Sequence, residues 1–204
     1  MILLLNFILF VLQFYVRRKN CLELEDSIDN ILCLLTYPFV ALISYMELHN
    51  LEDRIFSYTP VTEKLVYFMC LRLSFHFLLC RRVEYKIHHI SFSFCLGYIL
   101  ICRKFHYYAI TSFLMEFTQI PLILYYKTKN VLWGIVLWLF FIVFRLNVTI
   151  RVIYFHFQDS YKITFLENII SKLILIVMTF LNVYWFLLIT KKMYLKRHIL
   201  KVFN

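Results

Sequence analysis

The sequence predicts an all-α membrane protein, a bundle of about seven transmembrane helices around a polar cavity. Three observations lead to this prediction. First, 62% of the 204 residues are hydrophobic and 17% are charged, whereas soluble domains are about 45–50% apolar and about 25% charged. Second, apolar runs of spanning length recur along the chain between short basic stretches. Third, these runs lack the period-two alternation of barrel strands, so we expect the spans to be helices.

Seven apolar runs are candidates for these spans, because a helix needs about 20 residues, within a range near 17–25, to cross a bilayer. The runs cover residues 1–16, 30–47, 61–80, 87–102, 107–126, 131–150 and 166–190. The first and fourth are short, so we expect them to tilt little or to cross a thin bilayer. The longest connection, Glu47 to Thr59, is expected to form a short amphipathic segment.

The first run is expected to be a retained anchor and not a cleaved signal peptide. Residues 1–16 lack a basic start and a small-residue cleavage site, and Arg17-Arg18-Lys19 follows at once. Residues 1–27 are therefore predicted to be an anchor with its cytoplasmic loop. We predict a six-helix membrane domain over 28–192 and a basic cytoplasmic tail over 193–204.

The basic residues predict an orientation in the membrane. The formal net charge is +10, but the bases lie in twos and threes between apolar runs, a pattern typical of membrane flanks and not of a nucleic-acid surface. With the N-terminus outside, the cytoplasmic loops and tail carry 13 Lys and Arg residues and the opposite loops carry 6. The positive-inside rule therefore predicts a luminal N-terminus and a cytoplasmic C-terminus, in the endoplasmic reticulum or another endomembrane.

Some predicted spans contain polar side chains, although a charge at mid-bilayer costs at least about 2.5–3.5 kcal/mol. Arg72 and His76 stand one helical turn apart in the third run, and His88 and His89 open the fourth. Residues at this spacing lie on one face of a helix, so we expect Arg72 and His76 to point the same way. Such residues usually face the interior of a bundle and indicate function.

The later runs carry further polar side chains. Glu116 and Gln119 share a stripe of the fifth run, and Arg145 lies in the sixth with Thr149 one turn on. Four polar residues of the seventh run, Asn182 among them, project from one face. A structural alternative stays open, because interhelical hydrogen bonds hold membrane bundles together and an arginine paired with Glu116 would be a neutral ion pair.

Familiar catalytic motifs are missing from the sequence. It contains no HExxH, GxSxG or Walker loop, and seven scattered histidines cannot fill the two metal shells of a diiron enzyme. The six cysteines form no CxxC pair and are interpreted as small hydrophobic residues. We therefore expect no metal and no resident cofactor. A histidine base stays open, because imidazole titrates near neutral pH and accepts the proton of an attacking nucleophile.

Three short motifs occur in order along the chain. They are Glu84-Tyr-Lys-Ile-His88-His89, Phe113-Leu-Met-Glu116-Phe-Thr-Gln-Ile-Pro121 and Phe140-Phe-Ile-Val-Phe-Arg145. In order and spacing they resemble the signatures of TLC-domain proteins (the TRAM/Lag/CLN homology domain), over about residues 28–192. The resemblance implies helices around a polar cavity, with a cytoplasmic C-terminus.

The resemblance implies two kinds of function. One is a role in membrane lipid homeostasis, with a membrane lipid bound in the cavity. The other is a ceramide-synthase-type N-acyltransferase, which joins acyl-CoA as co-substrate to a sphingoid base, with His88 or His89 as the catalytic base and Glu116 and Arg145 placing the substrates. Met115-Glu116 stands where the synthases have His-Asp, so the non-synthase branch is favoured. A sorting receptor and a small transporter are further alternatives.

The candidate lipid-binding residues have two sources. The resemblance supplies two of them, and polarity within the predicted spans supplies the others. These residues are Glu116, Arg145, Arg72, His76 and Gln119.

Overall fold

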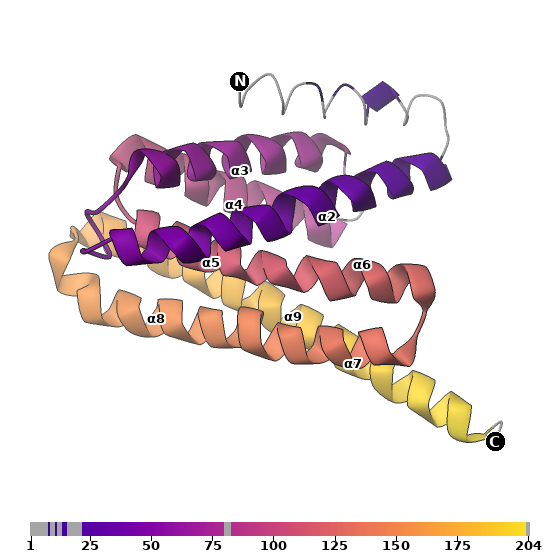
Figure 1. Ribbon diagram of the computed structural model, residues 1–204. Coiled ribbons are helices and arrows are strands. Elements are labelled where there is room, and N and C mark those ends of the chain that lie inside the picture. The colour runs from indigo at the N-terminus through magenta and orange to yellow at the C-terminus, as the bar shows by residue number, and fades with distance from the viewer. Residues whose placement is uncertain (1–7, 9–10, 12–13, 16–21, 80–82, 203–204) are drawn as a thin grey trace. The chain divides into compact units, whose positions relative to one another are not determined.

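The structure, a computed structural model, describes residues 8, 11, 14–15, 22–79 and 83–202 (Figure 1). Every regular element among these residues is a helix, which confirms the all-α prediction. The predicted first anchor, residues 1–16, lies largely outside the described residues. In chain order the helices are α2 (Leu22–Glu47), η1 (Leu48–Asn50), α3 (Pro60–Leu79), α4 (Val83–Cys102), α5 (His106–Phe113), η2 (Leu114–Thr118), α6 (Gln119–Thr128), α7 (Val131–Phe140), η3 (Phe141–Leu146), α8 (Asn147–Asp159), η4 (Ser160–Lys162) and α9 (Phe165–Val202).

The chain divides into two compact units, Met1–Phe113 (unit 1) and Leu114–Asn204 (unit 2). The predicted membrane domain, residues 28–192, therefore contains residues of both. The predicted fifth span, 107–126, is also shared: α5 belongs to unit 1, and η2 and α6 belong to unit 2. Pro121 explains the 3-10 turn before α6, because proline has no N–H to offer the carbonyl one turn earlier.

In unit 1, α3 packs along α4, and α5 packs against α2 and α3. The start of α3 follows from its sequence: Pro60 is suited to the first helical position, and Thr59 and Thr62 exchange side-chain hydrogen bonds across it. The Thr62 N–H donates to Thr59 Oγ1 over 3.1 Å and the Thr59 N–H donates to Thr62 Oγ1 over 2.9 Å. The Thr62 N–H, which has no carbonyl acceptor one turn earlier within the helix, is therefore satisfied by a side chain.

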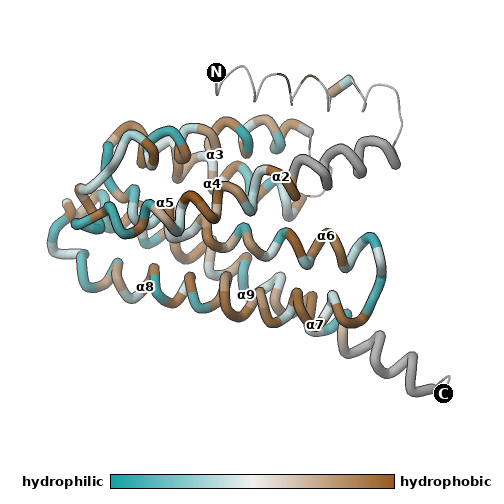
Figure 2. The backbone as a smooth tube through the Cα atoms, in the orientation of Figure 1, coloured by the Kyte–Doolittle hydropathy of each residue, from teal (hydrophilic) through white to brown (hydrophobic). Residues whose placement is uncertain are grey.

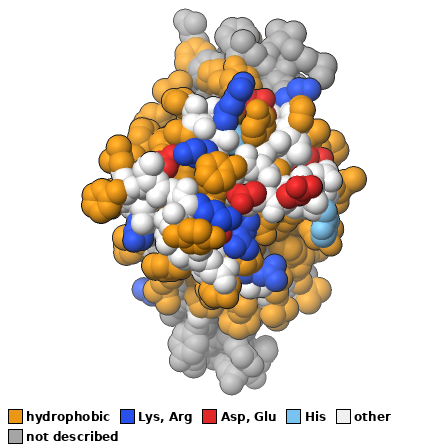
Figure 3. Space-filling model, turned by 90° about the vertical axis from the view of Figure 1, so that its left-hand side faces the viewer, with side chains coloured by type: hydrophobic (Ala, Val, Ile, Leu, Met, Phe, Trp, Pro, Cys, Tyr) orange, Lys and Arg blue, Asp and Glu red, His pale blue; other side chains and the backbone are white. Residues whose placement is uncertain are grey.

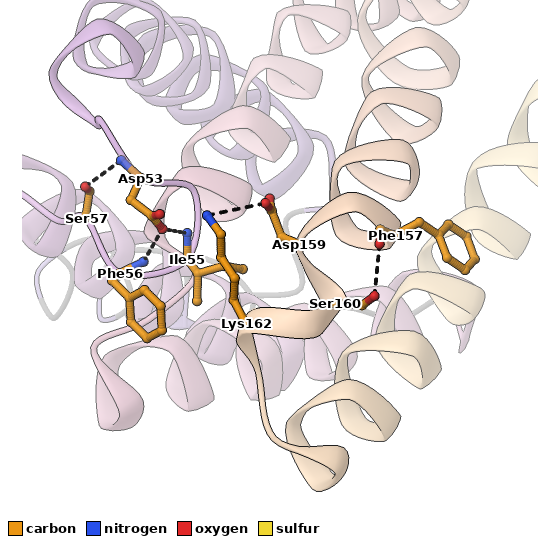
Figure 4. Close-up of polar contacts among 8 residues, drawn as sticks. All are labelled: Asp53, Ile55, Phe56, Ser57, Phe157, Asp159, Ser160 and Lys162. Atoms are coloured by element: carbon orange, nitrogen blue, oxygen red, sulfur yellow. Dashed lines mark hydrogen bonds and ion pairs between the residues drawn. The ribbon is translucent and has the colours of Figure 1, made fainter.

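The connection between η1 and α3 is an ordered turn (Figure 4). One oxygen of the Asp53 carboxylate accepts the N–H groups of Ile55 and Phe56, over 2.7 and 3.0 Å. The Phe105 N–H donates to the Ile55 carbonyl over 2.7 Å and ties this connection to the one before α5. Ile55 is buried and Phe56 is exposed, so the segment turns one apolar side chain inward and another outward.

In unit 2, the helix from Val131 to Asp159 is unbroken and contains a π-helical segment, η3. Its start is encoded by Asn130, whose side chain accepts the Leu132 N–H over 2.8 Å. Two helices of this unit, Val131–Lys162 and Phe165–Met193, are long and apolar enough to cross a membrane, judged by length and composition. Figure 2 shows α7 as a largely hydrophobic stretch that follows a polar turn.

Both units expose large apolar side chains. Phe94 and Ile101 of α4 and Phe180 of α9 are among the most exposed, and Figure 3 shows apolar side chains, in orange, at the surface beside charged ones. Soluble monomers rarely expose extended apolar surface. This surface agrees with an apolar environment around the helices.

Candidate functional site

The most complete polar site lies in unit 2, around the guanidinium of Arg145. This side chain projects from the π-helical segment η3 and is only 6% exposed. Its Nε donates to Thr118 Oγ1 over 2.9 Å, and its Nη1 donates to Asn182 Oδ1 over 3.3 Å. Because arginine stays charged in proteins, burial requires such partners. Residues from η2, η3 and α9 therefore meet at one buried charge.

Aromatic rings complete the surroundings of this charge. The guanidinium carbon lies 5.4 Å from the centre of the Phe141 ring and 5.3 Å from the Trp185 ring. A cation near an aromatic face is attracted to the electron-rich ring, and the attraction grows when water is excluded. The two rings stabilise the charge without using its N–H groups.

A further layer of hydrogen bonds orients the partners of Arg145. Asn182 Nδ2 donates to Thr149 Oγ1 over 3.0 Å and lies 3.7 Å from Met115 Sδ. The Thr149 hydroxyl donates in turn to the Arg145 carbonyl over 2.7 Å. Asn182 is fully buried, so its amide is held with the oxygen toward the guanidinium. The Arg145 network consists of Arg145, Thr118, Thr149, Asn182, Phe141 and Trp185.

A carboxylate lies beside this network. Glu116 of η2 is buried and accepts a hydrogen bond from Gln119 Nε2 over 3.3 Å. Its carboxyl group also lies within electrostatic range of the Arg145 guanidinium. The site therefore offers a planar cation suited to carboxylate or phosphate oxygens, and an acidic side chain close by.

Unit 1 holds a different site, built from histidines on the packed helices α3 and α4. His76 Nδ1 lies 2.9 Å from His89 Nε2, and the rings of His88 and His89 are 5.3 Å apart. His88 also stacks on Phe92, with ring centres 5.7 Å apart. A bond between two imidazoles needs one protonated and one unprotonated nitrogen, so the pair shares a proton. Arg72, one turn before His76, is fully buried.

The predicted site residues thus fall into two groups. Unit 1 holds Arg72, His76, His88 and His89, and unit 2 holds Glu116, Gln119 and Arg145. Within unit 1 the structure pairs His76 with His89, and within unit 2 it places Glu116 in the electrostatic range of Arg145.

Other members of the Arg145 network were not among the predicted site residues. Thr118 lies two residues after Glu116, and Asn182 lies on the polar face of the seventh run, so both had a sequence signal. Lys172, on the same predicted face, is exposed. Nothing in the sequence distinguishes the aromatic partners Phe141 and Trp185 as site residues, because aromatic residues are common throughout the chain.

A further buried histidine, His106, stands between two predicted spans at the start of α5. It is fully buried, and neither ring nitrogen has a hydrogen-bond partner among the described residues. Its ring packs on Tyr58, with centres 5.6 Å apart. Burial lowers the pKa of His106, and the negative charge of Glu63 opposes this shift. Burial therefore favours the neutral form of this side chain.

Comparison with known proteins adds no relative. No family model matches the chain, and no curated protein or solved structure matches it. Among the described residues, no group of three or more His, Cys, Asp or Glu side chains is placed to hold a metal ion. Over the described residues the chain is helical, and two of its helices are long and apolar enough to cross a membrane, judged by length and composition.

Proposed function

We propose that the chain is a multi-pass membrane protein of the endoplasmic reticulum or another endomembrane, acting in lipid homeostasis by binding a membrane lipid. The proposal includes a TLC-like bundle of about seven spans, with a luminal N-terminus and a cytoplasmic C-terminus. The observation that carries it is the burial of Arg145, in a helix long and apolar enough to cross a bilayer.

The chemistry of the Arg145 network indicates the part of the lipid that it would bind. A guanidinium binds phosphate or carboxylate oxygens through two parallel N–H groups. Thr118 and Asn182 fix its orientation before a ligand arrives, which reduces the entropy lost on binding. The Glu116 carboxyl group, which accepts a hydrogen bond from Gln119, is a second group that could accept a hydrogen bond from a headgroup amine. We infer that the ligand is a phospholipid or a related lipid with an ionic headgroup.

The test is lipid retention by the full-length protein purified in mild detergent. We expect native mass spectrometry to show one retained lipid per chain, and expect Arg145→Gln to lose it. Arg151→Gln is the matched control, because Arg151 is an exposed arginine of α8, less than two turns away. Circular dichroism checks that each variant keeps its helices. Equal retention by wild type and a folded Arg145→Gln variant would refute lipid binding at this site.

The histidine group of unit 1 favours a second candidate, an N-acyltransferase of ceramide-synthase type. In this reading His88 or His89 accepts the proton of a sphingoid amine as the amine attacks the thioester carbonyl of acyl-CoA. The amide C–N bond forms, the thioester C–S bond breaks, and the imidazolium returns the proton to coenzyme A, which leaves as its thiol. The His76–His89 hydrogen bond, at 2.9 Å, supports it because a neighbouring imidazole sets the tautomer of the base. Arg72 and His76 would then position the substrates.

An enzyme assay distinguishes the two proposed functions. The purified protein is incubated with a long-chain base and acyl-CoA, and N-acyl product is measured by mass spectrometry. Product formation that disappears in His88→Ala and His89→Ala would favour the acyltransferase. No turnover, combined with an altered phospholipid composition on deletion of the protein, would favour lipid homeostasis without catalysis.

A further inference from the structure

One end of unit 2 gathers exposed lysines around a tyrosine. We call it the basic end, and it consists of Tyr126, Lys127, Lys129, Lys191 and Lys192. The first three residues lie at the end of α6 and in the turn before α7, and the last two lie in α9 (Figure 1). All five are exposed, with Tyr126 at 38%.

Two of these lysines reach the same ring from different elements. Lys129 Nζ lies 5.0 Å from the centre of the Tyr126 ring, and Lys192 Nζ lies 5.7 Å from it. Lys129 takes the left-handed conformation that ends α6, with φ of 53°. The fold therefore brings two like charges toward one point, although like charges repel. A negatively charged ligand would remove that repulsion.

The sequence supplies no acidic side chain to these elements. No Asp or Glu occurs between Glu116 and Asp159, and none follows Glu167. Side chains of α6, α7 and the later part of α9 therefore add no negative charge to the basic end. Net positive charge at an exposed site attracts anionic partners.

The surface next to the basic end is apolar. Leu132 and Ile135, in the first turns of α7, are 62% and 46% exposed, and Leu187 of α9 is 60% exposed. Aromatic and basic residues that border an apolar surface are typical of a membrane interface. From Phe165 to Lys192, α9 rises roughly 40 Å at 1.5 Å per residue, close to the roughly 40–45 Å of a bilayer with its headgroups.

We propose that the basic end binds the anionic phospholipid headgroups of one leaflet and anchors unit 2 there. This inference rests on the proposed membrane location, and it differs from lipid retention at Arg145 because it concerns many exchanging lipids at the surface. Tyr126 lies at headgroup depth, and the lysines beside it contact phosphate or carboxylate groups. The apolar surface beside it favours a lipid partner over a nucleic acid or an acidic protein.

Fluorescence quenching in vesicles tests the anchor, because all three tryptophans (Trp133, Trp138 and Trp185) lie in unit 2. The full-length protein is reconstituted into phosphatidylcholine vesicles with a fixed fraction of brominated lipid, either brominated phosphatidylserine or brominated phosphatidylcholine. We expect stronger quenching by the serine lipid, and expect that preference to weaken as salt is raised. In a Lys129→Gln, Lys192→Gln variant the preference should fall by about fivefold per lysine, since each contributes about 1 kcal/mol near an anionic surface.

A matched control removes the same charge from elsewhere in unit 2. Lys162→Gln with Lys172→Gln should keep the wild-type preference for phosphatidylserine. Equal quenching by both brominated lipids in the wild type, or an unchanged preference in the Lys129→Gln, Lys192→Gln variant, would overturn the anchor. Absence of quenching by either lipid would instead refute the membrane location on which the anchor rests.

Discussion

The two units bury polar side chains of different chemistry. Unit 2 buries Arg145, whose charge is permanent, and the fold supplies an alcohol, an amide and two rings to stabilise it. Unit 1 buries His88 and His89 beside the half-buried His76; these imidazoles can be neutral, and His76 and His89 are hydrogen-bonded to each other. A permanent charge requires a fixed set of partners, whereas neutral imidazoles can transfer a proton between them and switch between two tautomers. Unit 2 therefore resembles a preorganised binding site, and unit 1 a site able to move protons.

Removal of Asn182 is expected to have the largest effect. In Asn182→Ala the buried guanidinium loses an acceptor and Thr149 loses a donor, so the free energy of unfolding should fall by about 3 kcal/mol. The measurement is unfolding in mixed micelles with increasing dodecyl sulfate, followed by tryptophan fluorescence. Thr179→Ala is the control, because the Thr179 hydroxyl donates only to Leu175 of its own helix, over 2.6 Å, among the contacts described. It should cost less than about 0.5 kcal/mol.

Loss of the histidine pair should cost less. His76→Leu keeps the approximate volume and removes one neutral hydrogen bond, so the free energy of unfolding should fall by about 1 kcal/mol in the same assay. His49→Leu, at an exposed histidine of η1, is the control. A loss in His76→Leu as large as that in Asn182→Ala would mean that the imidazole pair carries a buried charge, and the contrast between the units would fail.

The two glycines extend the comparison to packing. A methyl group on Gly134 of α7 would lie 2.5 Å from Met193 Sδ and 3.2 Å from the Tyr125 ring, whereas one on Gly97 of α4 would meet no atom within 4 Å. We expect Gly134→Ala to lose about 1 kcal/mol through overpacking. Gly97→Ala should gain about 0.5–1 kcal/mol, since alanine favours helix.

A second substitution checks the cause of the Gly134 effect. Adding Met193→Ala to Gly134→Ala should recover most of the loss, because the flexible methionine is the nearest obstacle. If the double variant does not recover its free energy of unfolding, the strain caused by Gly134→Ala does not come from contact with Met193.

His106 should give the smallest effect at neutral pH and a larger one in acid. Burial lowers its pKa in the folded state, so the unfolded state takes up the proton first as pH falls below about 6.5. Stability should therefore be retained above that pH and lost below it, by at most about 1.4 kcal/mol per pH unit from this group. Unfolding measured from pH 7.5 to 5 should show a shallower loss in His106→Leu. An identical pH profile in that variant would contradict the assignment.

The helices could be predicted from the sequence where charge or proline bounds an apolar run. The third run, 61–80, corresponds to α3, and the fourth, 87–102, to most of α4. The sixth run ends at residue 150, but the helix continues to Asp159, because its last turns are amphipathic and not uniformly hydrophobic. The 3-10 turn inside the fifth run cannot be predicted in the same way, because it depends on which groups donate hydrogen bonds to the carbonyls before Pro121.

The sites could be predicted only in part. A polar residue within an apolar run can be recognised in the sequence, and Arg145 and the histidines are identified in this way. Its partners depend on how helices rotate and slide against each other: Thr118 is 27 residues from Arg145 along the chain, and Asn182 is 37 residues away. Helical periodicity within one run contains no information about that rotation.

The π-helical segment that carries Arg145 has a consequence for how the chain tolerates changes in length. A π turn holds an extra residue relative to an α turn, so it offsets the angular phase of α8 against α7 by about 100°. We expect deletion of one residue within 141–146 to convert the segment to ordinary α-helix with little loss of backbone hydrogen bonding. The deletion would also turn Thr149 away from Asn182. The direction in which the side chains of α8 point therefore depends on the number of residues in the π-helical segment as well as on which residues they are.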